Sequence, residues 1–257
     1  MNTIEVEACS FGYENQPLVF RNISFALKAG EILAIMGCNG VGKSTLLKCI
    51  AGLLPWREGV CRINRKEKCQ CEKSIGYVAQ RKHISFPFRV RDLVCFGRSI
   101  SNPYFAAPSP EDYRITTEVL EDLHIAHLSK KPCSQLSGGE LQMVFIAKAL
   151  VSHPQILLLD EPETSLDIKN RLVLSEKLAR LGKKYNTTIL INSHDMNSMM
   201  RIATKCLFIG ASEYLFSSTQ DISETDISKY LGVQAKRIRS ASESYFILSA
   251  PSQEITL

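Results

Sequence analysis

The sequence lacks any apolar run long enough to cross a membrane. A spanning helix needs about 20 mostly apolar residues, whereas the longest apolar runs here have the length of buried strands, such as ILAIM (32–36) and ILLL (156–159). The stretch before Arg21 holds no Lys or Arg and no long apolar segment, so we expect no secretory signal there. These absences predict a cytoplasmic chain that reaches a membrane only through a partner.

A disulfide framework is also missing. The 9 cysteines are odd in number and scattered, which argues for reduced thiols. Cys69 and Cys71 form a CxC within RKEKCQCEK, but no second Cys or His pair follows at metal-ligand spacing. A metal site and ordinary loop thiols both stay open for this segment, and the spacing favours loop thiols.

Strong charge of either sign is absent. The chain has 31 basic and 26 acidic residues, a net charge of +5, which is too mild to predict a nucleic-acid partner. Its 257 residues with 45% hydrophobic content suit a large α/β domain, or a core domain with a subdomain. No repeat or Pro/Gly-rich linker divides it.

The apolar pattern predicts strands that alternate with helices. GEILAIMG (30–37) reads as a buried strand that enters a Gly-rich loop, and the helix STLLKCIAG follows. Later in the chain we expect helices and strands in alternation: a helix at 138–152, a strand at 155–160, a helix at 167–184, a strand at 187–192 and a helix at 195–203. This order predicts a parallel sheet covered by helices.

The remaining segments differ in character. Residues 4–9, 18–27 and 60–79 read as strands and turns, whereas residues 86–131 have helical periodicity and predict a helical insertion. Residues 211–257 are the least clear; DISETDISKYL resembles a helix and SYFILS a strand.

The loop after residues 30–37 matches a phosphate-binding pattern. GCNGVGKS, from Gly37 to Ser44, satisfies G-x-x-x-x-G-K-[ST] between a predicted strand and a predicted helix. Glycines let successive backbone N–H groups surround phosphate oxygens. In such loops the Lys, here Lys43, reaches the terminal phosphates and the Ser hydroxyl, here Ser44, binds Mg²⁺. A chance Gly-rich turn is the alternative, and the strand–helix context argues against it.

Two further segments carry chemistry. The strand ILLLDEP ends in Asp160, which suits Mg²⁺, and Glu161, which is placed to polarise an attacking water. SQLSGGELQ (134–142) combines a polar residue, glycines and a glutamate just before a helical run, and helix starts of this kind bind anions. The chain thus has two phosphate-facing helix starts but only one nucleotide loop.

Taken together, these motifs resemble those of the nucleotide-binding subunits of ABC transporters. The resemblance runs from about residue 3 to about residue 235 and rests on GCNGVGKST, YVAQ (77–80), LSGGE (136–140), ILLLDEP (156–162), TSLD (164–167) and INSHD (191–195), which occur in the family's order. It implies an α/β P-loop NTPase fold, an ABC cassette with a mostly parallel sheet core, an antiparallel β part and a helical subdomain. By this resemblance the ATP-binding domain spans 1–235, with the helical subdomain inserted at about 86–152, and residues 236–257 form a tail.

The resemblance also implies the role of each site residue, with ATP and Mg²⁺ as cofactors. The residues expected to bind ATP are Tyr13, Gly37, Asn39, Gly40, Gly42, Lys43, Ser44 and Thr45. Those expected to act on Mg²⁺ are Ser44, Gln80 and Asp160, and the catalytic set is Glu161, His194 and Gln80. The signature residues Ser137, Gly138, Gly139 and Glu140 and the interface residue Asp167 are expected to serve a second copy of the chain.

In this family two subunits pack head to tail, so each signature helix caps the ATP of the other subunit. The resemblance therefore implies a homodimer peripheral to the cytoplasmic membrane face, bound to polytopic permease subunits and indirectly to a substrate-binding protein. Two segments resemble the iron-chelate, haem and cobalamin importer branch of this family. They are the pattern V-x-D-L-V-x-x-G-R in the helical insertion and the later sequence ISKYLGVQAKRI. Departures from the usual family residues are Cys38, Val41, Lys148 and Glu163, none of which removes a catalytic group.

Other classes compete with this interpretation. Zinc and manganese importer ATPases are close relatives of the iron-chelate branch. A soluble ABC ATPase, such as an iron–sulfur assembly factor, would have no permease. A degenerate regulatory cassette would not hydrolyse ATP, but Lys43, Asp160, Glu161 and His194 are all present.

Overall fold

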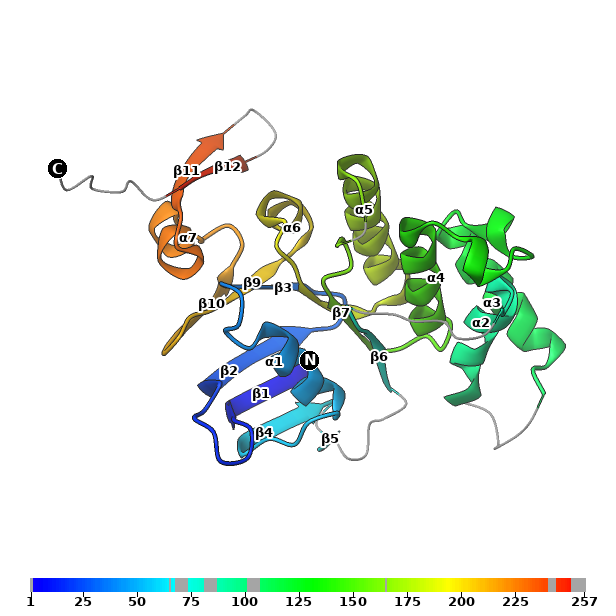
Figure 1. The fold of residues 1–257 in the computed structure, drawn as a ribbon. Helices are drawn as coiled ribbons and strands as arrows, with labels where there is room; N and C mark the ends of the chain where they lie inside the picture. Colours follow the sequence, from blue (N-terminus) through cyan, green and yellow to red (C-terminus); the bar gives the residue numbers. More distant parts are fainter. Residues whose placement is uncertain are drawn as a thin grey trace.

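A computed structural model describes residues 2–64, 66–67, 74–80, 87–100, 107–164, 166–239 and 244–250. These residues form two larger packed sheets with a group of helices beside them, and a separate two-stranded hairpin near the C-terminus (Figure 1). Within the described ranges no helix is both long and apolar enough to span a membrane. The predicted segment around Cys69 and Cys71 lies outside these ranges.

The larger sheet has six strands in the order β10-β9-β3-β8-β7-β6. Its members are β3 (Ile32–Met36), β6 (Ile75–Val78), β7 (Ile156–Asp160), β8 (Thr188–Asn192), β9 (Lys205–Ile209) and β10 (Tyr214–Ser218). The neighbours from β6 to β9 pair in parallel, and β10 pairs antiparallel with β9. Every residue of β3, β7 and β8 is buried, which explains their uninterrupted apolar sequences. The predicted parallel core is confirmed.

The smaller sheet is antiparallel, in the order β2-β1-β4-β5. It consists of β1 (Asn2–Phe11), β2 (Phe20–Lys28), β4 (Glu58–Ile63) and β5 (Lys66–Glu67). Helix α1 (Lys43–Ala51) lies between this sheet and the parallel one, and its Leu46, Leu47 and Ile50 share a core with both (Figure 1). This sheet is the predicted antiparallel part.

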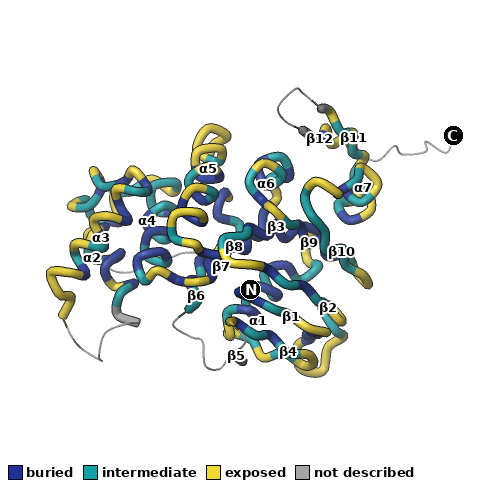
Figure 2. Tube along the Cα trace, turned by 180° about the vertical axis from the view of Figure 1, so that it is seen from behind, coloured by how far each residue is buried: buried dark blue, intermediate teal, exposed yellow. Residues whose placement is uncertain are grey.

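The opposite face of the parallel sheet is covered by helices. They are α4 (Gly138–Leu150), α5 (Ile168–Tyr185) and α6 (Met196–Ile202). Alternate residues of β3 divide between the two cores: Leu33 and Ile35 face α1, whereas Ile32, Ala34 and Met36 belong to the helical core. Figure 2 shows the buried strands enclosed in this way.

The helical insertion packs on α4. It contains α2 (Val90–Cys95), a 3₁₀ turn η3 (Phe96–Ile100), α3 (Pro110–Asp122) and the short turns η4 (Ala126–Leu128) and η5 (Cys133–Gln135). A Cβ at Gly97 would lie 2.1 Å from the carbonyl oxygen of Lys148, so only glycine allows η3 to approach α4 this closely. The insertion is thereby fixed to the helix that carries the signature residues.

The chain continues after β10 into α7 (Glu224–Leu231) and a hairpin of β11 (Gln234–Arg239) and β12 (Ser244–Ser249). Asn197 of α6 holds this hairpin: its side chain bonds both the N–H and the carbonyl oxygen of Phe246. Arg237 lies over the Phe246 ring at 4.7 Å. Arg237 is therefore held within this C-terminal unit by its contacts with Phe246 and with the carbonyl oxygen of Ile222.

Candidate functional site

The predicted site residues follow the carboxyl ends of neighbouring parallel strands. The Gly-rich loop follows β3, and Gln80 follows β6. Asp160 ends β7, with Glu161 directly after it, and His194 follows β8. Because parallel strands end at one edge of the sheet, residues far apart in sequence meet there. The strand order β3-β8-β7-β6 places all of these loops side by side.

The loop between β3 and α1 has the backbone of a phosphate cradle. Gly37, Gly40 and Gly42 have φ values of 146°, 83° and 102°, a region that other residues rarely adopt. Gly42 is the N-cap of α1 and offers no side-chain cap, so the helix start stays open to an anion. Asn39 and Gly40 are exposed at the rim, and Thr45 is half-buried on α1.

Lys43 turns back over this loop. Its Nζ donates hydrogen bonds to the carbonyl oxygens of Gly37 at 2.8 Å and Cys38 at 2.9 Å. Burial lowers the pKa of Lys43, while the nearby Glu161 carboxylate partly opposes this. A buried ammonium at a helix start provides strong attraction for a phosphate group.

Ser44 and Asp160 meet beneath the loop. The Ser44 hydroxyl donates to Asp160 Oδ1 at 2.8 Å, and Asn192 Nδ2 donates to the same oxygen at 2.6 Å. Burial and the charge of Asp160 raise the pKa of Tyr77 to about 12. Among the described residues, Asn192 Oδ1 is buried without a hydrogen-bond partner. The site therefore combines a hydroxyl, a carboxylate and an amide oxygen, a donor set that fits Mg²⁺.

Glu161 adopts an unusual backbone conformation. Its φ is 48°, in the left-handed region that non-glycine residues rarely occupy. Glu161 Oε2 accepts a hydrogen bond from Gln80 Nε2 at 2.5 Å, and Oε1 lies 3.0 Å from His194 Nε2. Glu161 therefore contacts both of the other residues expected to be catalytic, from a backbone conformation of the kind found at functional sites.

The signature residues form a capped helix start elsewhere on the molecule. Ser137 is the N-cap of α4; its hydroxyl accepts from the Glu140 amide, and Glu140 Oε2 accepts from the Ser137 amide at 2.7 Å. This backbone hydrogen bond lowers the pKa of Glu140. The capping box uses the amides of residues 137 and 140, so those of Gly138 and Gly139 can meet an anion. Helix α4 lies in the helical layer, apart from α1 (Figure 1).

Two of the predicted site residues lie at the surface of the protein. Tyr13 is 43% exposed and packs edge-on against Phe11. Asp167 is the N-cap of α5, and its carboxylate accepts from the Asn170 amide at 2.8 Å. The structure therefore gives Asp167 a local capping role and leaves Tyr13 accessible.

Sequence reasoning missed two groups of residues at the site. Asn192 and Tyr77 contact or face the carboxylate of Asp160, and Glu163 bonds the residues that lead into His194. Glu163 had been noted only as a departure from the family pattern. The signal that could have found Asn192 is a polar residue at the end of an otherwise apolar strand, TTILIN.

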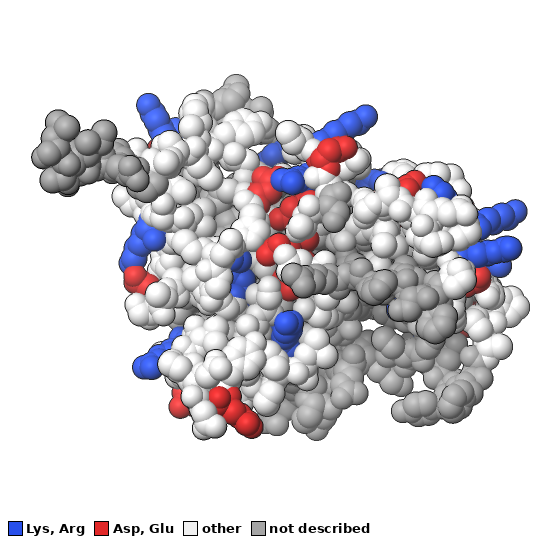
Figure 3. Space-filling view, viewed as in Figure 1, with Lys and Arg blue, Asp and Glu red and all other residues white. Residues whose placement is uncertain are grey.

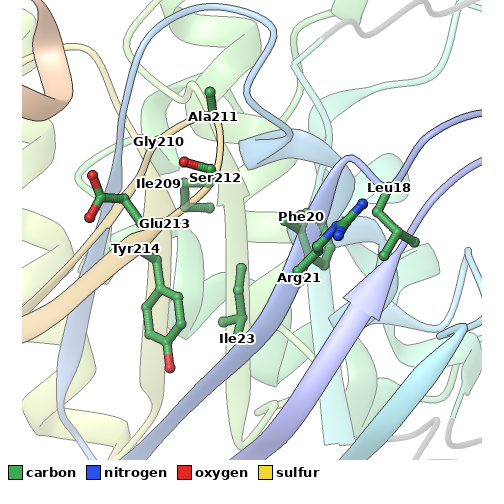
Figure 4. Close-up of a pocket in the computed structure, with 10 residues that line it drawn as sticks. All are labelled: Leu18, Phe20, Arg21, Ile23, Ile209, Gly210, Ala211, Ser212, Glu213 and Tyr214. Carbon is green, nitrogen blue, oxygen red and sulfur yellow. The ribbon is translucent and has the colours of Figure 1, made fainter.

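A separate cavity of about 280 Å³ lies between β2 and the turn that joins β9 to β10 (Figure 4). Arg21 and Glu213 line it, and the Glu213 carboxylate lies 2.7 Å from Lys229 Nζ. No predicted site residue lines this cavity. This cavity is therefore separate from the predicted site residues at the strand ends.

The fold and the loop between β3 and α1 define a P-loop nucleotide-binding protein. Comparison with known proteins identifies the family: the sequence pattern of the family described as "ABC transporter" matches residues 20–164. The chain belongs to the ABC transporter family and contains its ATP-binding domain.

Individual relatives cover most of the chain. It is 34% identical over 219 residues to the molybdate import ATP-binding protein MolC of Haemophilus influenzae, with 85% of this chain and 83% of MolC covered. It is 34% identical over 233 residues to the "Probable iron chelatin transport ATP-binding protein" of Helicobacter pylori, with 86% of this chain and 91% of the relative covered. Other relatives are named for zinc and manganese transport.

A solved structure has the same fold over nearly the whole length. It is a chain of a metal-chelate type ABC transporter in an inward-facing conformation, with a TM-score of 0.87 and 29% identity, and it covers 98% of this chain and 99% of that one. The expected ABC cassette fold is confirmed, and the similarity extends over the described part of the C-terminal hairpin.

Proposed function

We propose that this chain hydrolyses ATP and thereby powers import of a metal chelate through membrane permease subunits. The observation that carries the hydrolytic part is the contact of Glu161 with both Gln80 and His194 beside Lys43, Ser44 and Asp160. A carboxylate held between an amide and an imidazole, next to a phosphate loop, is suited to orient a water molecule.

In the proposed reaction, the water oxygen attacks the γ-phosphorus while the bond to the β–γ bridging oxygen breaks. Glu161 orients the water and takes its proton, and ADP leaves with the bridging oxygen. Lys43 and the loop amides hold the phosphate oxygens, and His194 donates to the transferring group. Ser44, Asp160 and Gln80 would hold Mg²⁺, which offsets negative charge on the phosphates when bound.

The location of the signature residues supports a shared site. Gly138 and Gly139 begin a capped, exposed helix, but α4 stands apart from α1 of the same chain (Figure 1). A second copy related by a two-fold axis would bring its Ser137, Gly138 and Gly139 to the γ-phosphate held by the first. Each dimer would then contain two such sites.

The membrane partner is supported by the insertion and by the relatives. Phe96 lies in the insertion and is 40% exposed, a large apolar side chain available for contact with another protein. The structural neighbour is a metal-chelate type transporter, and a relative is named for iron chelatin. Molybdate is the alternative cargo, favoured by the similarity to MolC.

We propose that the dimer binds permease subunits at the cytoplasmic membrane face and that these subunits receive cargo from a substrate-binding protein. We also propose that no nucleic acid is involved. Basic side chains are scattered on the face in Figure 3, which agrees with the last point.

Purification of the tagged chain from detergent-solubilised native membranes tests the partner. We expect a polytopic permease in equal amount, identified by mass spectrometry, together with ATPase activity. Phe96→Asp should lose the permease and keep ATP binding, whereas Leu53→Asp, which alters another exposed apolar residue, should keep both. A chain that is active but purifies without any membrane protein would favour the soluble ATPase class.

Cargo is tested by uptake. Cells that lack the chain should regain uptake of a labelled ferric chelate when it is restored, and Lys43→Ala should not restore it. Restored uptake of labelled molybdate, without the ferric chelate, would replace the iron-chelate assignment by the molybdate one.

A further inference from the structure

The carboxylate of Glu163 joins the loop after β7 to the loop that carries His194. Glu163 is only 8% exposed. Its Oε1 accepts hydrogen bonds from the Ser193 hydroxyl at 2.6 Å and from the His194 amide at 3.0 Å. Hydrogen bonds to a carboxylate are stronger than those between neutral groups, so this is a firm connection between the two loops.

The connection extends to the start of α6. Ser193 Oγ, which donates to Glu163, also accepts from the Asp195 amide at 3.0 Å. Asp195 is in turn the N-cap of α6 and accepts from the Ser198 amide. The amides of residues 194 and 195 are therefore held by Glu163, one directly and one through Ser193.

This arrangement has a cost in stability. Glu163 Oε2 is buried and has no hydrogen-bond partner among the described residues. A buried carboxylate oxygen without a donor destabilises a fold. A role in stability alone therefore does not explain why a carboxylate occupies this position, and departures of this kind are expected at functional sites.

We infer that Glu163 is a positioning residue for ATP hydrolysis, which fixes the backbone of His194 so that its imidazole meets the γ-phosphate and Glu161. The inference rests on the hydrolytic function proposed above. Glu163 is one of the departures from the usual family residues. Glu163 acts through the Ser193 hydroxyl and the His194 amide and does not itself contact the substrate.

Substitution of Glu163 separates its acceptor role from its contribution to folding. Glu163→Ala leaves the Ser193 hydroxyl and the His194 amide without their acceptor and should lower kcat about tenfold, with KM for ATP within about twofold. Glu163→Gln keeps an acceptor oxygen for both donors and should retain kcat within about twofold. Glu176→Ala, at an exposed glutamate, is the matched control and should leave kcat unchanged.

Amide hydrogen exchange gives a readout that does not depend on catalysis. The segment 187–196 should exchange faster in Glu163→Ala than in the parental chain and Glu163→Gln, because the His194 amide loses its acceptor. Parental kcat or unchanged exchange in Glu163→Ala overturns the inference. A loss of kcat in Glu163→Gln equal to that in Glu163→Ala also overturns it. A parental chain without ATPase activity would instead overturn the proposed function, so the two failures are distinguishable.

Discussion

At the scale of single residues, Glu161 depends most on its surroundings. Its left-handed backbone, with φ of 48°, directs the carboxylate toward Gln80 and His194. The amide of Glu161 donates to the carbonyl oxygen of Asn192 at 2.9 Å, which holds this conformation in place. The strained residue is also the one to which we assign the orientation of water, as expected where strain serves function.

Glu161→Gln should abolish most hydrolysis and leave ATP binding intact. Glutamine keeps the shape of the side chain but cannot accept the proton of the attacking water, so kcat should fall by roughly 10² to 10⁴-fold. Steady-state kinetics and equilibrium binding of ATP measure the two effects separately. Hydrolysis at the parental rate would show that Glu161 is not the base.

The sequence was informative for those residues whose role depends on local spacing. Lys43 and Ser44 could be assigned because the loop pattern and its flanking strand and helix are contiguous. The roles of Asn192 and Glu163 could not be assigned in this way. Asn192 bonds Ser44, which is 148 residues away, and Glu163 bonds Ser193, which is 30 residues away, and only the order of the strands brings these partners together. No local pattern indicates that a strand-end Asn bonds the carboxylate of the neighbouring strand.

At the scale of elements, Asp122 connects α3 to α5. Its carboxylate accepts from Lys184 Nζ at 2.6 Å and from the Tyr185 hydroxyl. Burial raises the pKa of Asp122, but these hydrogen bonds outweigh burial and hold the pKa below its ordinary value. The helical insertion is thereby bonded to a helix that covers the parallel sheet.

Asp122→Asn should destabilise the chain by about 1 to 2 kcal/mol near neutral pH, the contribution of hydrogen bonds to a charged group. A carboxyl whose pKa is lowered by folding stabilises the fold above its unfolded pKa of about 3.8, and this contribution is lost as pH falls through the lower folded value. Urea unfolding of the parent and the variant should therefore differ at pH 7 and converge at strongly acidic pH. Glu121→Gln alters the exposed neighbouring residue and should leave the free energy of unfolding unchanged at both pH values. An equal loss at every pH would contradict the charged role.

The elements that sequence predicted well are those with long apolar runs. Strands β3, β7 and β8 are buried throughout, and nearly all of their residues are apolar. Strands β9 and β10 were not predicted, because β9 follows α6 closely and no alternation sets β10 apart. Residues of β10 are all half-buried at the sheet edge, where apolar patterns are weakest.

At the scale of the whole molecule, the phosphate loop and the signature helix of one chain lie apart, and the shared site that we propose needs both. The phosphate loop and Glu161 gather at one edge of the sheet, while the signature helix begins in the helical layer (Figure 1). Ile168 is 77% exposed beside Asp167, an apolar surface at the start of α5 that a second copy would cover. In the shared site that we propose, ATP therefore acts as the link between two copies.

Ser137→Arg tests this arrangement without altering the phosphate loop. The larger charged side chain should prevent the signature from approaching a γ-phosphate on another copy. ATP binding to a single chain should be unchanged, and hydrolysis should be lost. Ser137→Ala is the control for the lost helix cap, which costs about 1 kcal/mol of stability. Loss of single-chain ATP binding in Ser137→Arg would mean that the signature acts within its own chain.

The most direct test measures the molar mass of Glu161→Gln by light scattering, with and without Mg²⁺–ATP. We expect one-chain mass without nucleotide and two-chain mass with it, because bound ATP that is not hydrolysed holds the two copies together. Addition of Ser137→Arg to the same chain should keep it at one-chain mass. One-chain mass for Glu161→Gln at saturating ATP, or two-chain mass in the variant with Ser137→Arg, would contradict the shared site.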